Sequence, residues 1–144
     1  MGITLEGKKG NLSIDIGCGG FNKLRLKIAE LIGGEFVKHY NLLFKPEIHF
    51  MDFQTDSFFD KYDEETEALM KKEKISKKVI DFLYQPDCEG SIHYGACKQI
   101  LKIIGDYDDN ILYGYCARSD CAKFSDFKAI LQECVDNKCD LLWS

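Results

Sequence analysis

Residues 79–104 read VIDFLYQPDCEGSIHYGACKQILKII, and this pattern predicts two helices joined by a short polar loop. Apolar side chains at helical spacing form one face of the first helix: Val79, Ile80, Phe82 and Leu83. Ser76 can cap this helix through its hydroxyl, and Pro86 ends it, because the residue before a proline is disfavoured in the helical conformation. The second helix has its own apolar stripe: Cys97, Ile100, Leu101 and Ile104. Gly105 suits the left-handed conformation that commonly ends a helix.

The loop between these helices resembles part of an EF-hand calcium loop. If Gly90 is placed at position 6 of that motif, Asp87 falls at position 3 and Glu89 at position 5. Gln85 and Ala96 occupy positions 1 and 12, so the first aspartate and the bidentate glutamate are missing. Because Ca²⁺ takes about six or more oxygen ligands, we predict that Asp87 and Glu89 bind the loop backbone and that Gly90 supplies a positive φ.

The same loop, Asp87-Cys88-Glu89-Gly90-Ser91-Ile92 followed by Cys97-Lys98, resembles the Ser-Asp-Cys-Asp-Gly-Glu-Leu…Glu-Cys-Lys signature of a family of small uncharacterised bacterial and phage proteins. Phe21-Asn22-Lys23-Leu24-Arg25 is similar to the Phe-x-x-(Trp/Leu)-Arg stretch of that family. This sequence departs from the family at Glu89, where Asp is usual, and at Ala96, where an acid is common. The family has no established activity, so the resemblance implies shared architecture and brings no catalytic residues.

Short apolar runs near both ends of the chain predict a small sheet. Residues 3–6 and 12–16 are joined by Gly7-Lys8-Lys9-Gly10, which indicates a hairpin. Residues 139–143 predict a terminal strand, which we expect to pair with residues 12–16. Residues 111–116 predict either a short strand or a tight connection.

The remaining apolar spacing predicts helices at residues 21–32, 35–44, 62–74 and 125–137. Ser125 is the expected N-cap of the last helix and Asn137 its C-terminal cap. Residues 48–59 show no clear period and are predicted to be irregular. The chain is therefore predicted to be one mostly helical α+β domain, residues 1–144, whose sheet joins the N-terminal hairpin to the C-terminal strand.

Composition argues against two classes of partner. The net charge is −5, whereas binding to a nucleic-acid backbone depends on clustered Lys and Arg, so we expect no nucleic acid. No apolar run approaches the length of a membrane span, so we expect no membrane partner. The first residues do not resemble a signal peptide, and we expect a cytoplasmic protein, where thiols stay reduced.

The stretch Ile14-Asp15-Ile16-Gly17-Cys18-Gly19-Gly20 resembles the first motif of S-adenosylmethionine-dependent methyltransferases. Such a site also needs a parallel βαβ unit and an acid at the end of the next strand. No Asp or Glu ends an apolar strand after the helix at residues 21–32. We therefore favour a simple turn between a strand and a helix, with ligand binding at Asp15, Gly17 and Gly19 as the alternative.

The cysteines offer two further candidates. Cys116 and Cys121, like Cys134 and Cys139, are separated by four residues, a spacing that zinc sites permit. However, Cys134 lies on the predicted buried face of the last helix, which argues against zinc. A cysteine nucleophile is disfavoured because Cys97 lies on a buried stripe and Cys88 is flanked by acids.

These observations predict a non-enzymatic interaction or accessory module with an unidentified protein partner and the option of homo-oligomerisation. We expect no cofactor. Methyltransferase-like ligand binding at the Gly17–Gly20 turn and metal binding are the alternatives. Phe53, Phe58 and Phe59 are the candidate partner surface, although phenylalanine is more often buried.

Overall fold

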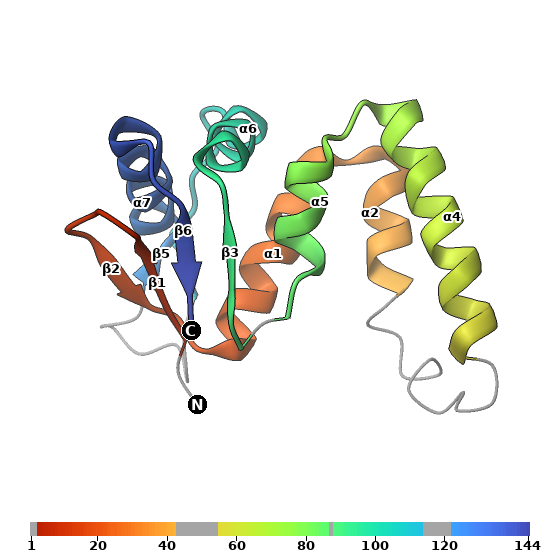
Figure 1. The fold of residues 1–144 in the computed structure, drawn as a ribbon, viewed down its shortest axis with the longest axis horizontal. Coiled ribbons are helices and arrows are strands. Elements are labelled where there is room, and N and C mark those ends of the chain that lie inside the picture. Colours follow the sequence, from red (N-terminus) through yellow and green to blue (C-terminus); the bar gives the residue numbers. More distant parts are fainter. Residues whose placement is uncertain (1–2, 43–54, 87, 114–121) are drawn as a thin grey trace.

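The computed structural model describes residues 3–42, 55–86, 88–113 and 122–144 (Figure 1). The α+β fold expected from the sequence is confirmed. The elements follow in the order β1 (Thr4–Gly7), β2 (Ser13–Asp15), α1 (Cys18–Ile32), α2 (Gly34–Asn41), α4 (Thr55–Glu73), α5 (Lys77–Tyr84), β3 (Gly90–Ile92), α6 (Tyr94–Ile104), β4 (Leu112–Tyr113), β5 (Ala122–Lys123), α7 (Phe124–Asn137) and β6 (Leu141–Trp143). No helix in the described segments is long and apolar enough to cross a bilayer.

The main sheet is antiparallel and has the strand order β2-β1-β6-β3. The predicted hairpin is confirmed as β1 and β2. The predicted pairing of the C-terminal strand with residues 12–16 is wrong, because β6 lies between β1 and β3. Leu5 and Trp143 are paired in the register and both are buried, whereas Leu12 is 43% exposed. Strand β1, in which Leu5 and Gly7 are buried, therefore lies inside the sheet beside β6, and β2, which has no buried residue, forms an edge.

The helices form a series that leads away from the sheet. Helix α7 packs against β1, β2 and β6, and α6 packs against α7. Helix α1 contacts α5, α6 and α2, and α4 packs mainly against α2. Figure 1 accordingly shows α2 and α4 at the end of the molecule farthest from the sheet.

The two central helices are confirmed, but a strand lies between them. Residues Gly90–Ile92 form β3, which pairs with β6. The backbone N–H and carbonyl of Ser91 bind the side-chain amide of Gln85 instead of a further strand. Gln85 thus covers part of the sheet edge, which otherwise would present open backbone groups.

The predicted positive φ of Gly90 is wrong. Among the described glycines φ is positive at Gly17, Gly33, Gly34 and Gly105. Gly105 therefore ends α6 with a positive φ as predicted, but its ψ of −127° lies outside the left-handed helical conformation. Glycine is required at position 90 for space, because an added Cβ would clash with Cζ2 of Trp143. The close approach of the backbone to this indole explains why the loop carries a glycine.

Several helix boundaries differ from the prediction, and α1 begins at Cys18, three residues before the predicted start. Helix α7 begins one residue earlier than Ser125, and the backbone N–H of Lys123 donates to the Asp126 carboxylate. Its C-terminal cap is Lys138, with φ 51°, instead of Asn137. Residues 55–59, predicted to be irregular, belong to α4. A helix forms here without a clear apolar period because only part of the surface of α4 is buried. The prediction for residues 48–54 lies outside the described segments.

Candidate functional site

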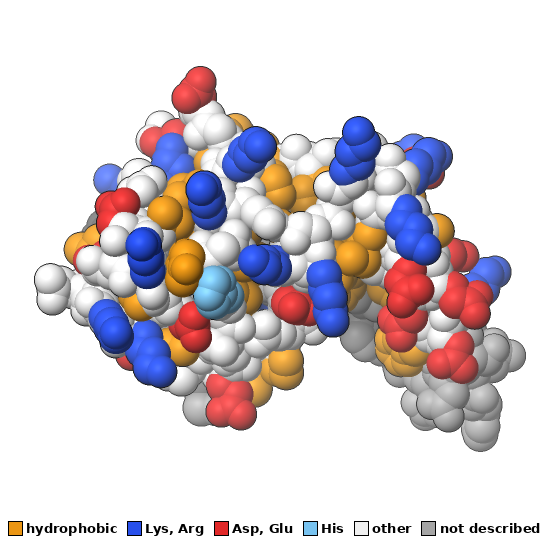
Figure 2. Space-filling view, turned by 45° about the horizontal axis from the view of Figure 1, so that its top comes forward, with side chains coloured by type: hydrophobic (Ala, Val, Ile, Leu, Met, Phe, Trp, Pro, Cys, Tyr) orange, Lys and Arg blue, Asp and Glu red, His pale blue; other side chains and the backbone are white. Residues whose placement is uncertain are grey.

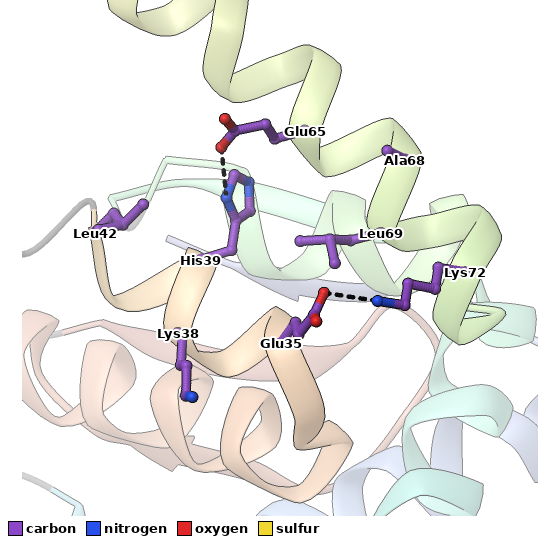
Figure 3. Close-up of a pocket in the computed structure, with 8 residues that line it drawn as sticks. All are labelled: Glu35, Lys38, His39, Leu42, Glu65, Ala68, Leu69 and Lys72. Carbon is purple, nitrogen blue, oxygen red and sulfur yellow. Dashed lines mark hydrogen bonds and ion pairs between the residues drawn. The ribbon is translucent and has the colours of Figure 1, made fainter.

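A groove with a volume of about 450 Å³ lies between α2 and α4. Figure 3 shows the side chains that line it: Glu35, Lys38, His39 and Leu42 from α2, and Glu65, Ala68, Leu69 and Lys72 from α4. Leu42, Ala68 and Leu69 provide apolar surface. Charged groups stand at the rim, where Lys72 Nζ lies 3.0 Å from Glu35 Oε2.

His39 is the buried polar residue of this groove. Its Nε2 lies 2.6 Å from Thr66 Oγ1, and the Thr66 hydroxyl donates to the carbonyl of Tyr62. Because this hydroxyl already donates its hydrogen, Nε2 is the donor to Thr66, and Nδ1 is the ring nitrogen with a lone pair. Nδ1 lies 3.6 Å from Glu65 Oε2, as the dashed line in Figure 3 marks.

The electrostatics of the groove keep His39 neutral. Burial lowers the pKa of His39, and the nearby Glu65 carboxylate opposes that shift. A neutral imidazole lone pair beside a carboxylate presents two hydrogen-bond acceptors at the same place. This pair is suited to receive a donor with positive charge, such as a lysine or arginine side chain.

Tyr62 holds His39 in place through its ring and its hydroxyl. The ring of His39 stacks on Tyr62 at 3.9 Å between centroids, and the Tyr62 hydroxyl donates to the His39 carbonyl. The Tyr62 and Tyr84 hydroxyls are 2.8 Å apart. Burial, the largest cause, raises the pKa of Tyr84 to about 12, so both phenols are neutral and hold the network together.

The predicted glycine turn is a helix start. Gly17 has φ 71° and precedes α1, and Phe21 N–H donates to its carbonyl. Asp15 accepts a hydrogen bond from the Thr4 hydroxyl at 2.7 Å, and no atom would lie within 4 Å of a Cβ added at Gly19. Every strand pair given for the described residues is antiparallel. The parallel βαβ setting of a methyltransferase motif is therefore not formed around this turn in the described segments.

The polar loop is described in part. Cys88 and Glu89 are exposed, Gly90 belongs to β3, and Asp87 lies outside the described residues. Cys88 is a free cysteine. The described residues of this loop are neighbours in the sequence, but their side chains do not form a common ligand site.

The two stretches that carry the family resemblance are neighbours in the fold. The Arg25 guanidinium donates to the carbonyls of Phe82 and Gln85 at the end of α5, just before the polar loop. Phe21 packs against Trp143, with 5.3 Å between ring centroids, and Trp143 donates from Nε1 to the carbonyl of Pro86. A cation at a helix C-terminus is favourable for its dipole. Both stretches therefore serve the packing around Trp143.

The cysteine candidates are only partly described, since Cys116 and Cys121 lie outside the described residues. Cys134 and Cys139 are buried, and a Cβ added at Gly7 would lie within 3.4 Å of both sulfurs. A hydrogen bond with Cys97 and burial raise the pKa of Cys134, which keeps this thiol protonated and unreactive. Among the described residues no group of three or more His, Cys, Asp or Glu side chains could hold a metal ion.

The proposed aromatic surface is also described only in part. Phe59 on α4 is 42% exposed, while Phe53 and the side chain of Phe58 lie outside the described part of the chain. His93, which precedes Cys97 by four residues, caps α6 by accepting from the N–H of Gly95 through Nδ1.

Sequence reasoning missed the groove itself. His39 and Thr66 had no identifiable partners in the sequence, because they are far apart along the chain. A helical-wheel signal existed in part: Tyr62, Thr66 and Leu69 share one face of α4 at spacings of four and three residues. Comparisons with models of protein families, with curated proteins and with solved structures found no match.

Proposed function

We propose that this chain is a non-enzymatic interaction module that forms a two-fold dimer through helix α4. The observation that supports this proposal is a separation of charge on one side of the molecule. Acidic side chains gather over α4, and lysines spread over the neighbouring helices (Figure 2). The proposed partner is a second copy of the chain, because the chain carries both halves of a complementary surface.

The acidic face consists of exposed side chains on the solvent side of α4: Asp60, Asp63, Glu64 and Glu67. These residues point away from α2, since the side of α4 that packs inward carries Tyr62 and Thr66. Exposed Phe59 adds apolar surface at the same end. A face of this kind attracts a positively charged surface and steers its approach.

The lysine face consists of exposed side chains on α5 and α6: Lys77, Lys78 and Lys98. Nζ of Lys78 would lie 2.8 Å from a Cβ added at Gly95, so this lysine links the α5 and α6 parts of the face. Both faces are visible in one view of the molecule (Figure 2).

Two adjacent patches of opposite charge suit a closed dimer. Rotation about a two-fold axis between them sets the acidic face of each copy against the lysine face of the other, so the contact is made twice. The acceptor pair of His39 and Glu65 in the neighbouring groove offers a further place for a lysine of the second copy. Such a dimer weakens as salt is added, because its exposed charges are screened.

The test measures the mass of the assembly by native mass spectrometry and sedimentation at low and high ionic strength. Two variants reverse one face each: Glu64→Lys with Glu67→Lys, and Lys78→Glu with Lys98→Glu. Each variant alone is expected to be a monomer. A mixture of the two, with one labelled by nitrogen-15, is expected to form only the mixed dimer, since both contacts are then restored.

The wild-type protein is the reference, and Glu6→Lys, which reverses one exposed charge on the sheet, is the matched control that should keep the dimer. A wild-type monomer at low ionic strength would overturn the proposal. A dimer that persists in both reversal variants would show that other surfaces hold it and would overturn the assignment to α4.

A further inference from the structure

A second pocket lies where the end of α1, the junction of α4 and α5, and α6 meet. It encloses about 540 Å³, within the range of roughly 300–1,000 Å³ that is usual for small-molecule sites. Its apolar wall is formed by Leu31, Ile32, Ile75, Val79 and Ile103. This pocket is separate from the groove between α2 and α4.

Two residues that line this pocket carry a buried oxygen atom without a hydrogen-bond partner, Glu73 Oε2 and Gln99 Oε1. The other carboxylate oxygen of Glu73 accepts from the backbone N–H of Glu35 at 2.9 Å, which holds the side chain in place at the start of α2. A buried acceptor that lacks a donor is costly. These two oxygens therefore need a donor that the described side chains do not supply.

Two lysines, Lys74 and Lys102, line the same pocket and are exposed. Lys74 has φ 56°, and the next residue, Ile75, donates its backbone N–H to the carbonyl of Met70. The left-handed conformation turns the chain sharply between α4 and α5 and brings Lys74 to the pocket. The pocket thus combines acceptors, positive charges and an apolar wall.

We infer that this pocket binds a zwitterionic α-amino acid with a branched apolar side chain. Its ammonium group would donate to Glu73 and Gln99, its carboxylate would face Lys74 and Lys102, and its side chain would contact the apolar wall. A carboxylic acid without the ammonium leaves both acceptors unsatisfied. An amine without the carboxylate places a positive charge beside two lysines.

The first experiment titrates the full-length protein with L-leucine and follows its backbone amides by NMR. Shifts are expected at residues 73–76 and 99–103. Two leucine analogues serve as matched probes: 3-methylbutylamine, which lacks the carboxylate, and 4-methylpentanoate, which lacks the ammonium. Each should bind at least about tenfold more weakly than leucine, because a hydrogen bond to a charged group is lost. Absence of shifts with millimolar leucine, or equal binding of the three probes, would overturn the inference.

Variants separate the roles of the two ends of the ligand. Glu73→Gln keeps an oxygen for the N–H of Glu35 and should weaken leucine binding about tenfold, while 4-methylpentanoate binding stays the same. Lys102→Ala should weaken leucine and 4-methylpentanoate but not 3-methylbutylamine. Lys23→Ala, exposed on α1 and outside the pocket, should change none of them.

If Glu73 and Gln99 had only a structural role, their substitution would leave the affinity of the folded protein for leucine unchanged. If Glu73→Gln fails to fold, Gln99→Leu removes the other buried acceptor and should lower the affinity for leucine without loss of the native NMR spectrum. Unchanged leucine affinity in the folded variant would contradict the assignment of the ammonium site.

Discussion

The sheet end and the α2–α4 end of this molecule are held by different kinds of interaction. At the sheet end, Trp143 packs against the rings of Phe21 and Phe82, at 5.3 and 5.9 Å between centroids. At the other end, His39, Tyr62 and Thr66 form a buried hydrogen-bond network, and α4 packs mainly against α2. Apolar packing is shared among many neighbours, whereas a hydrogen-bond network depends on a few exact geometries.

We expect the α2–α4 end of the molecule to open before the sheet end. The residues around Trp143 contact several helices and strands, so their loss affects the whole fold. Helix α4 has one main neighbour, and local opening with low free energy is typical of such an element.

Trp143→Ala should produce the largest loss of stability, about 3–5 kcal/mol. The substitution removes the ring contacts with Phe21 and Phe82 and the hydrogen bond to the Pro86 carbonyl. Urea unfolding measures the change. Leu142→Ala, at the partly exposed neighbouring position, is the control and should cost far less. Similar losses in the two variants would show that the indole is not central to the core.

Arg25→Met should destabilise the protein by about 2–4 kcal/mol. The flexible apolar side chain keeps the packing on Phe21 but leaves the carbonyls of Phe82 and Gln85 without their donor. Chemical unfolding gives the magnitude. Lys23→Met alters an exposed residue of the same helix and should have little effect. If both variants behave alike, the guanidinium contributes nothing at the end of α5.

Tyr62→Phe should cost about 1–2 kcal/mol and act locally. It removes the hydroxyl that joins the His39 carbonyl to Tyr84. Amide hydrogen exchange should become faster in α4 while β6 stays protected. Lys61→Ala, exposed on the same helix, serves as the comparison. Faster exchange in β6 as well would mean that the two ends unfold together, contrary to the contrast drawn above.

Lys138→Gly should stabilise the protein by about 1 kcal/mol, because Lys138 has φ 51° and glycine adopts this conformation without strain. Thermal unfolding detects the gain. Asn137→Gly tests the alternative cap, since Asn137 is the last helical residue of α7. It should destabilise by roughly 0.5–1 kcal/mol. The reverse pattern would place the end of the helix at Asn137.

The smallest expected effect is a pH dependence that comes from His39. Burial lowers its pKa in the folded state, so the unfolded chain binds a proton first as the pH falls through about 6.5. The stability that His39 contributes is therefore present above that pH and is lost progressively below it. Unfolding at about pH 7 and about pH 5 should show a smaller loss for His39→Gln than for the wild type. An equal loss in both proteins would exclude His39 as the cause.

The elements that depend on local signals could be predicted well. Ser76 caps α5 through its hydroxyl, as expected, and Gly105 ends α6 with φ 56°. The buried face of α7 contains Cys134, as predicted. In each case neighbours within one or two turns determine the outcome, so the pattern along the chain is sufficient.

The candidate site could not be predicted in the same way. His39 meets Thr66, and Glu73 meets the backbone of Glu35, across separations of 27 and 38 residues. Nothing in the sequence marks these partners, because single polar residues on a helix are usually exposed. Gly90 shows the same limit, because the residue that requires a glycine there is Trp143, which lies far away in the sequence.

The α+β class, the hairpin and most helices can be predicted from the amino-acid sequence, since periodicity and capping are local properties of the chain. Long-range packing sets the place of β6 between β1 and β3, the contact of Gln85 with the edge of β3, and the two pockets that flank the start of α2. These features arise from contacts between distant segments, which compete for the same apolar surface and the same hydrogen-bond partners. Their outcome depends on the packing of the whole chain and not on any one stretch of it.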